Sequence, residues 1–283
     1  MQARLAHQSY GKSRVRLTKV TRRADRHELA ELSIDIALEG DFAASYLTGD
    51  NRQVIATDTM KNTVYVLAAD HPLDSPESFA LTLAEHFVRR NAHVSAATVN
   101  IEEPTWRRID TLTGVHPHAF VAGGPQRRTC RVRHEREKTT VRAGVAGLSI
   151  LKTTNSAFRG FLRDEFTTLP ETDDRIFATT LDANWLYRPG SGNWNAAHAV
   201  IVQALLDVFA GHVSLAVQQT LFAMGQAALA ACDAIDEIHL AMPNQHRIPV
   251  NLAPFGLPSR NEIFVTTSEP FGLIEATLAR DAT

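Results

Sequence analysis

The sequence predicts an α+β chain in which helices cover one face of an antiparallel sheet. Three observations support this prediction. Apolar and polar side chains alternate along much of the first 40 residues, as is typical of strands. Apolar residues then recur at helical spacing from Ser75 to Asn91. Finally, each half runs from strands through helix to a strand ending in a polar turn, so we expect two related domains, 1–140 and 141–283.

The composition is that of a folded globular protein. Of 283 residues, 44% are hydrophobic and 21% are charged, which is enough for a sizeable core. The net charge of −2 favours neither nucleic acid nor an anionic membrane as a partner. No stretch approaches the roughly 18 apolar residues of a membrane span. The two cysteines, Cys130 and Cys232, provide neither a disulfide framework nor a cysteine-rich zinc site.

The two ends of the sequence favour a cytoplasmic location. The N-terminal MQARLAHQSYGKSRVRL lacks the apolar stretch of a secretory signal. The final ARDAT is not a peroxisomal tripeptide of the S-K-L type. We therefore expect a cytoplasmic protein of bacterial type.

In the first half, GKSRVRLTKVTR and HELAELSIDIALEGDF predict a long hairpin with a loop at Arg22–Arg26. The next run, VIATDTMKNTVYVLA, starts and ends like a strand, but polar residues interrupt its middle. SPESFALTLAEHFVRRN predicts a helix, because Ser75 suits the cap and Pro76 the first helical position. HVSAATVNIEEPTWRRI then predicts a strand that ends in the polar turn NIEEPTW.

Further strands are predicted by HAFVAGG and by RRTCRVRHEREKTTVRAGVAGLSILKTT, in which Cys130 and Val132 share one face and Arg131 and Arg133 the other. The arginine face is typical of a solvated strand. In the second half, FRGFLRDEFTTLPETDDRIFATTLDANWLYR predicts a loop and then a strand. NAAHAVIVQALLDVFAGH and VSLAVQQTLFAMGQAALAAC predict helices, and IDEIHLAMPNQHRIPVN a strand that breaks at Pro243.

Several common motifs are absent. GSGNWN starts like a dinucleotide-binding loop but lacks the third glycine and the preceding strand. There is no phosphate-binding G-x-x-x-x-G-K-[ST] and no G-x-S-x-G nucleophile motif. His116 and His118 lack a third ligand at useful spacing, so no metal site is expected.

Polar clusters at the ends of predicted elements are the remaining candidates for chemistry. They are TDTMKN, ETDDR, AVQQT and PNQH. Each is ordinary by itself, because a Thr-Asp pair is typical of a turn or cap and an arginine is typical of a salt bridge. What is specific to this chain is that several such clusters occur together, each within a longer recognisable stretch of sequence.

The stretches YGKSRVRLTKV, VIATDTMKNTVYVLA, HPHAF, LSILKTTNSAFRGFLRDEFTTLPETDDRI, SLAVQQTLFAM and LAMPNQH occur in this order from Tyr10 to His246. With the tail GLPSRNEIFVTTSEPFGLIEATLAR, they resemble the urate oxidase (uricase) family over nearly the whole chain. The resemblance implies two tandem T-fold domains per chain. It also implies a homotetramer in which two chains close a β-barrel, barrels stack around a central tunnel, and active sites lie at chain interfaces.

The resemblance implies an oxidoreductase. It would oxidise urate with O₂ and water to 5-hydroxyisourate and H₂O₂, without metal or organic cofactor. Arg175 would grip one urate edge through its planar guanidinium, and Gln218 would face the opposite edge with its amide. Phe158 would stack on the purine plane; taken without the family, it is typical of a core aromatic.

The resemblance assigns the remaining pocket residues as follows. Val217 and Leu169 would line the pocket, and Asp58 would hold the substrate through its backbone amide. Thr57 would both contact the substrate and take part in catalysis. Asn244 would face the space above the ring, where O₂ and later water sit.

Lys12, Thr57 and His246 resemble the family's proton relay. Urate must lose a proton before it can reduce O₂, and a hydroxyl alone is a poor base at neutral pH. A neighbouring lysine could accept that proton through Thr57, and His246 could orient or relay it. Two alternatives stay open: a zinc-dependent T-fold hydrolase of purines or pterins, and a non-catalytic purine-binding or structural tetramer.

Overall fold

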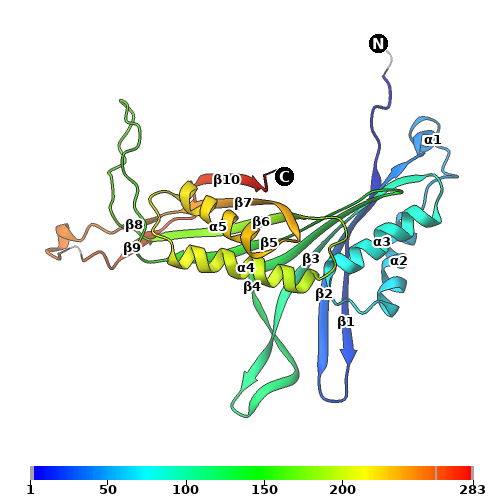
Figure 1. The fold of residues 1–283 in the computed structure, drawn as a ribbon, viewed down its shortest axis with the longest axis horizontal. Coiled ribbons are helices and arrows are strands. Elements are labelled where there is room, and N and C mark those ends of the chain that lie inside the picture. Colours follow the sequence, from blue (N-terminus) through cyan, green and yellow to red (C-terminus); the bar gives the residue numbers. More distant parts are fainter. Residues whose placement is uncertain (1–2, 259, 282–283) are drawn as a thin grey trace. The chain divides into compact units, whose positions relative to one another are not determined.

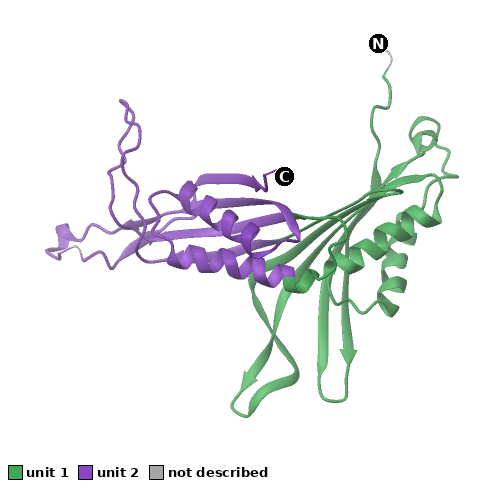
Figure 2. Ribbon diagram, in the orientation of Figure 1, with its two compact units in different colours: residues 1–144, 186–196 green, residues 145–185, 197–283 purple. Residues whose placement is uncertain are grey.

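The computed structural model describes residues 3–258 and 260–281. Ser259, in the tail stretch, and the last two residues of ARDAT lie outside the described residues. The chain divides into two compact units (Figures 1 and 2). Unit 1 comprises Met1–Gly144 and Leu186–Ala196, and unit 2 comprises Val145–Trp185 and Ala197–Thr283.

Unit 1 contains four antiparallel strands in the order β1-β2-β3-β4. Their bounds are β1 Tyr10–Arg22, β2 His27–Gly40, β3 Val94–Thr111 and β4 Gly114–Glu135. The predicted hairpin is confirmed, since β1 pairs with β2 from Tyr10↔Leu38 to Arg22↔His27. The register shifts once, between Lys12 and Val15.

Three helices follow the hairpin in unit 1: α1 Ala43–Leu47, α2 Thr57–Asp70 and α3 Pro76–Arg90. The prediction of α3 is confirmed with its cap, because the Ser75 hydroxyl accepts a hydrogen bond from the Ser78 N–H at 3.2 Å. Helix α3 packs on β3 and β4, and α2 packs on β1. Helix α3 buries Phe79, Leu83 and Phe87 completely or almost completely.

The strand-like reading of VIATDTMKNTVYVLA is wrong. Thr57–Asp70 is the helix α2, and Val54–Ala56 before it belong to no strand. Met60, Val64 and Ala68 are buried, and their spacing of four places them on one helical face. Burial of this face against β1 outweighs the strand preference of Val and Tyr.

Two strands also run further than predicted. Strand β3 does not end in a turn at NIEEPTW; it passes Pro104 with a register shift between Pro104 and Trp106. Strand β7, Ile235–Gln245, does not break at Pro243, which pairs with Leu273 in β10. A proline removes only its own N–H from the ladder, so neighbouring pairs can hold such a strand together.

Unit 2 has the strand order β5-β6-β7-β10. Its elements are β5 Thr139–Lys152, β6 Phe177–Tyr187, α4 Trp194–Gly211, α5 Val217–Ala231, β7 Ile235–Gln245, β8 Arg247–Pro249, η1 Ala253–Phe255, β9 Phe264–Thr266 and β10 Gly272–Ala279. Of these, β5 and α4 begin in unit 1. Helix α5 begins at Val217, later than its pattern suggested, and packs on β7 and β10. Both α4 and α5 lie on the same side of these strands (Figure 1). The α+β prediction is confirmed.

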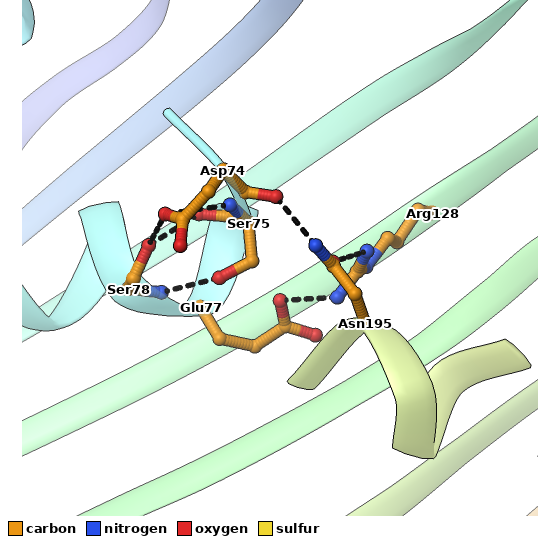
Figure 3. A network of polar contacts seen from close by, with 6 residues as sticks. All are labelled: Asp74, Ser75, Glu77, Ser78, Arg128 and Asn195. Carbon is orange, nitrogen blue, oxygen red and sulfur yellow. Dashed lines mark hydrogen bonds and ion pairs between the residues drawn. The ribbon is translucent and has the colours of Figure 1, made fainter. Parts of the chain in front are cut away.

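A buried polar network ties the start of α3 to β4 in unit 1 (Figure 3). Glu77 is fully buried and forms an ion pair with Arg128 at 2.7 Å. Arg128 also donates to the Asn195 side-chain oxygen at 2.6 Å, and Asn195 donates to the Asp74 carbonyl at 2.8 Å. Burial raises the pKa of Glu77, while the charge of Arg128 opposes that rise.

In the described part of the chain, no helix is long and apolar enough to cross a membrane.

Candidate functional site

The predicted site residues are divided between the two units, and the set in each unit is called a cluster below. The unit 1 cluster comprises Lys12, Thr57 and Asp58. The unit 2 cluster comprises Phe158, Leu169, Arg175, Val217, Gln218, Asn244 and His246. Each cluster is built by a separate set of strand ends, loops and helix starts.

Lys12 lies on β1 immediately before its register shift. Gly11, beside it, approaches β2 so closely that an added Cβ would lie 1.7 Å from the Ile36 carbonyl oxygen. Only glycine fits there without moving the strand. The Lys12 side chain is half-buried.

Thr57 and Asp58 are the first two residues of α2. Their backbone N–H groups therefore have no partner within the helix, and Ala56 at the N-cap offers no side-chain oxygen. Such N–H groups suit an anionic or carbonyl-rich ligand. The start of α2 thus matches the predicted use of the Asp58 backbone amide.

The Asp58 carboxylate is already occupied. It forms an ion pair with Lys61 and accepts a hydrogen bond from the Asn62 amide at 3.1 Å. The hydrogen bond from Lys61 lowers the pKa of Asp58 most, and the charge of Lys12 contributes to the same shift. The Lys12 charge is therefore felt at the Asp58 carboxylate in the first turn of α2.

In unit 2, Arg175 lies against the ring of Phe158. The guanidinium carbon is 5.3 Å from the ring centroid, which is a cation–π distance. Burial lowers the pKa of the Arg175 guanidinium. The Phe158 ring also stacks on Phe161, with centroids 4.9 Å apart and planes 13° from parallel. A partly desolvated cation beside flat aromatic surface suits a planar anion.

Backbone hydrogen bonds hold Phe158 in a fixed place. Its N–H donates to the Thr172 carbonyl at 2.9 Å, and the Thr172 N–H returns a bond at 3.1 Å. Ala157 donates to the Ser214 carbonyl at 2.8 Å, on the approach to α5. The Phe158 loop is therefore tied both to the Arg175 segment and to the segment before Val217.

Asp174 completes this bracing, although the sequence analysis did not single it out. Its carboxylate accepts from the Thr154 hydroxyl at 2.8 Å and from the Ser156 N–H at 3.3 Å. The hydrogen bond from Thr154 is the main reason that the pKa of Asp174 is lowered. Asp174 sits beside Arg175 in ETDDR, but nothing in that motif distinguishes it from Asp173.

Val217 and Gln218 are the first two residues of α5. Val217 is buried and Gln218 is exposed, so the Gln218 amide faces outward while Val217 anchors the helix start. The neighbouring Gln219 has a local role, since its side-chain oxygen accepts from the Leu215 N–H at 2.9 Å. The structure therefore separates two adjacent glutamines that the sequence alone could not.

Asn244 and His246 lie at the end of β7 and are half-buried. Asn244 pairs with Gly272 in β10, and the His246 carbonyl accepts from the Thr267 N–H at 3.2 Å. Between them, the Gln245 side chain donates to the Thr180 hydroxyl at 2.9 Å.

Leu169 lies on the long loop before β6, and its side chain is 53% exposed. Its role in lining a pocket stays a prediction. His116 and His118 contact each other, with ring centroids 4.5 Å apart. The described residues contain no group of three or more His, Cys, Asp or Glu side chains arranged to hold a metal ion.

Comparison with known proteins identifies the class. The family model described as Uricase matches residues 8–133 and 141–275. The uricase of Arthrobacter globiformis is 42% identical over 277 residues, covering 98% of this chain and 90% of that protein. The uricase of Dictyostelium discoideum is 35% identical and covers 98% of each chain.

The fold agrees with the sequence comparison. The crystal structure of the Arthrobacter globiformis uricase matches with a TM-score of 0.95 and 41% identity, covering 100% of this chain and 97% of that one. The fold and these sequence matches define an α+β enzyme. The chain belongs to the uricase family.

Proposed function

We propose that this enzyme oxidises urate with O₂ and water to 5-hydroxyisourate and H₂O₂, with neither metal nor organic cofactor. The observation that carries the proposal is the partly desolvated Arg175 guanidinium beside the Phe158 ring, in a chain of the uricase family. Urate is a planar anion with paired carbonyl and nitrogen acceptors at its edges. It matches that pair in both charge and shape.

In this proposal, Arg175 and Gln218 grip opposite edges of urate while Phe158 stacks on its plane. Val217 and Leu169 line the pocket. The free N–H groups at the start of α2 supply the contact through Asp58, and the Thr57 hydroxyl supplies another. Asn244 faces the space above the ring, where O₂ reacts and water later adds.

Lys12, Thr57 and His246 form the proposed proton relay. The influence of the Lys12 charge on Asp58 supports this, because Asp58 is the neighbour of Thr57 in the chain. Urate loses a proton through the Thr57 hydroxyl toward Lys12, and His246 relays or orients the proton. Two electrons then pass from the urate dianion to O₂, giving peroxide, and water adds to the oxidised ring to give 5-hydroxyisourate.

We further propose that the site is completed between two copies of the chain in a homotetramer, each chain consisting of T-fold domains 1–140 and 141–283. The division of the site residues between the two units supports this arrangement. The unit 1 cluster of one chain would then meet the unit 2 cluster of another. The cytoplasmic location expected from the sequence stays a prediction.

The test is to follow the urate ultraviolet band together with O₂ uptake and peroxide, using purified protein treated with a chelator. Equal consumption of urate and O₂, with peroxide formed, is the expected result. Urate binding without consumption would favour the non-catalytic purine-binding alternative. Activity that disappears with the chelator and returns with zinc would favour a metal-dependent enzyme instead.

A further inference from the structure

The hydroxyl of Tyr10 holds both polar groups of one residue far away in the sequence. It accepts a hydrogen bond from the Ile55 N–H at 2.8 Å and donates one to the Ile55 carbonyl at 3.2 Å. Tyr10 is the first residue of β1, and Ile55 lies in the irregular segment that leads into α2. The Tyr10 side chain thus connects the start of β1 to the segment just before α2.

The ring of Tyr10 is itself held in place. It packs edge-on against Phe42, with centroids 4.7 Å apart and planes at 87°. Phe42 is 1% exposed and packs edge-on against His93 in turn, so the aromatic anchor is rigid. Burial also raises the pKa of Tyr10, so its hydroxyl stays a neutral donor across the physiological range.

Tyr10 and Ile55 each lie two residues before a member of the proposed relay. Tyr10 precedes Lys12 on β1, and the register is regular between them, so both side chains are on the same face. Ile55 precedes Thr57, at the start of a helix that has no side-chain N-cap. The Tyr10–Ile55 contact therefore joins a point two residues before Lys12 to a point two residues before Thr57.

We propose that Tyr10 is a positioning residue that sets the separation between Lys12 and the Thr57 hydroxyl. This inference rests on the proposed urate oxidase function. Tyr10 has no need to touch urate, because it acts through the Ile55 peptide. Its loss slows proton transfer and leaves the grip of Arg175 and Gln218 on the substrate intact.

The first variant is Tyr10→Phe, which keeps the ring against Phe42 and removes only the hydroxyl. We expect kcat to fall about ten-fold, because the half-buried Ile55 N–H loses its partner and the start of α2 loosens. KM for urate should stay within about two-fold of the wild-type value. An unchanged kcat, or a loss confined to KM, would overturn the proposal.

The matched control is Tyr65→Phe. The Tyr65 hydroxyl also joins α2 to β1, donating to the Arg16 carbonyl at 3.4 Å, but it lies away from Thr57 and its side chain is exposed. We expect its kcat to stay within about two-fold of the wild-type value. An equal loss in both variants would mean that any link between α2 and β1 matters, and would overturn a specific role for Tyr10.

The decisive measurement repeats Tyr10→Phe in a Thr57→Ala background. If Tyr10 acts through the Thr57 hydroxyl, the second change should lower kcat by less than about two-fold there. A full ten-fold loss in both backgrounds would indicate a general structural role and reject positioning of Thr57.

Amide hydrogen exchange across Ile55–Met60 tests the contact without an activity readout. Tyr10→Phe should speed exchange in this segment, while Tyr65→Phe should leave it unchanged. If wild-type protein failed to oxidise urate, the proposed function would fall while this measurement still decided the Tyr10–Ile55 tie. Unchanged exchange in Tyr10→Phe would reject the tie itself.

Discussion

At the scale of single residues, the unit 2 cluster separates side chains that hold the site from side chains available to a ligand. Asp174 and the backbone of Phe158 are fully engaged in bracing the loop. The Arg175 guanidinium contacts an aromatic ring and is partly desolvated. In the proposed function, Arg175 binds the substrate and the adjacent Asp174 holds the loop, so changes to these two residues should affect the kinetics differently.

Arg175→Ala should raise KM for urate by about 10- to 100-fold, because a charge-assisted bidentate contact is lost. Arg175→Lys, the control, should recover only part of the affinity, since an ammonium cannot copy the planar fork. Steady-state kinetics measure both effects. Full recovery by lysine would mean that Arg175 supplies only its charge.

Lys12→Ala should act on turnover instead. We expect kcat to fall about 100-fold or more with little change in urate binding, because the proposed role of Lys12 is proton transfer. Thr57→Ala should lower turnover similarly while weakening binding modestly. Equilibrium binding of urate under anaerobic conditions separates the two effects. A loss of binding as large as that in Arg175→Ala would contradict this division of labour.

Asp174 should make the fold sensitive to acid. Its folded-state pKa is lowered, so its stabilising contribution is present above the unfolded pKa and is lost as the pH falls through the folded value. Asp174→Asn should therefore lower Tm at neutral pH, and the difference from wild type should shrink below about pH 4. Thermal melts across this range provide the check. A difference independent of pH would show that the carboxylate charge is irrelevant.

At the scale of elements, the buried Glu77–Arg128 pair connects α3 to β4. Arg128→Met should destabilise the fold by about 3–5 kcal/mol, because it leaves Glu77 buried without its partner. The control is Arg127→Met, which breaks an exposed pair with Glu102 and should cost about 0–1 kcal/mol. Denaturant unfolding measures both free energies.

The loss of stability on breaking the Glu77–Arg128 pair should also depend on pH. The pKa of Glu77 is raised, so protonation of Glu77 stabilises the fold at low pH, and that contribution is lost as the pH rises through the folded value. Without Arg128 the rise in pKa is unopposed. Arg128→Met should therefore be less destabilising near pH 5 than near pH 8. The reverse order would mean that Glu77 stays charged in the variant.

At the scale of the whole molecule, the site residues are divided between two units, and subunit mixing tests whether two chains share each site. Thr57→Ala impairs the unit 1 cluster and Arg175→Ala the unit 2 cluster. Co-refolding the two impaired variants should restore roughly a quarter of wild-type activity at urate concentrations below the wild-type KM, because about a quarter of the hybrid sites contain both intact clusters. Each variant refolded alone is the control. No recovery would place each site within one chain.

The sequence by itself determined those helices and strands for which several local sequence signals point to the same structure. Alternation predicted the β1–β2 hairpin, and a serine cap followed by proline predicted α3. Long motifs, read together, also indicated the uricase family, which the comparisons confirm. These features depend on neighbours in the chain, so they can be read without knowing the fold.

Only the tertiary structure decided the rest. Whether Thr57–Asp70 is strand or helix depended on burial of Met60, Val64 and Ala68 against β1, which local preference does not contain. Strand β7 passes Pro243 because β10 pairs across it. The tie between Tyr10 and Ile55 joins residues 45 positions apart. Each outcome is set by partners distant in the sequence, and local patterns carry no information about them.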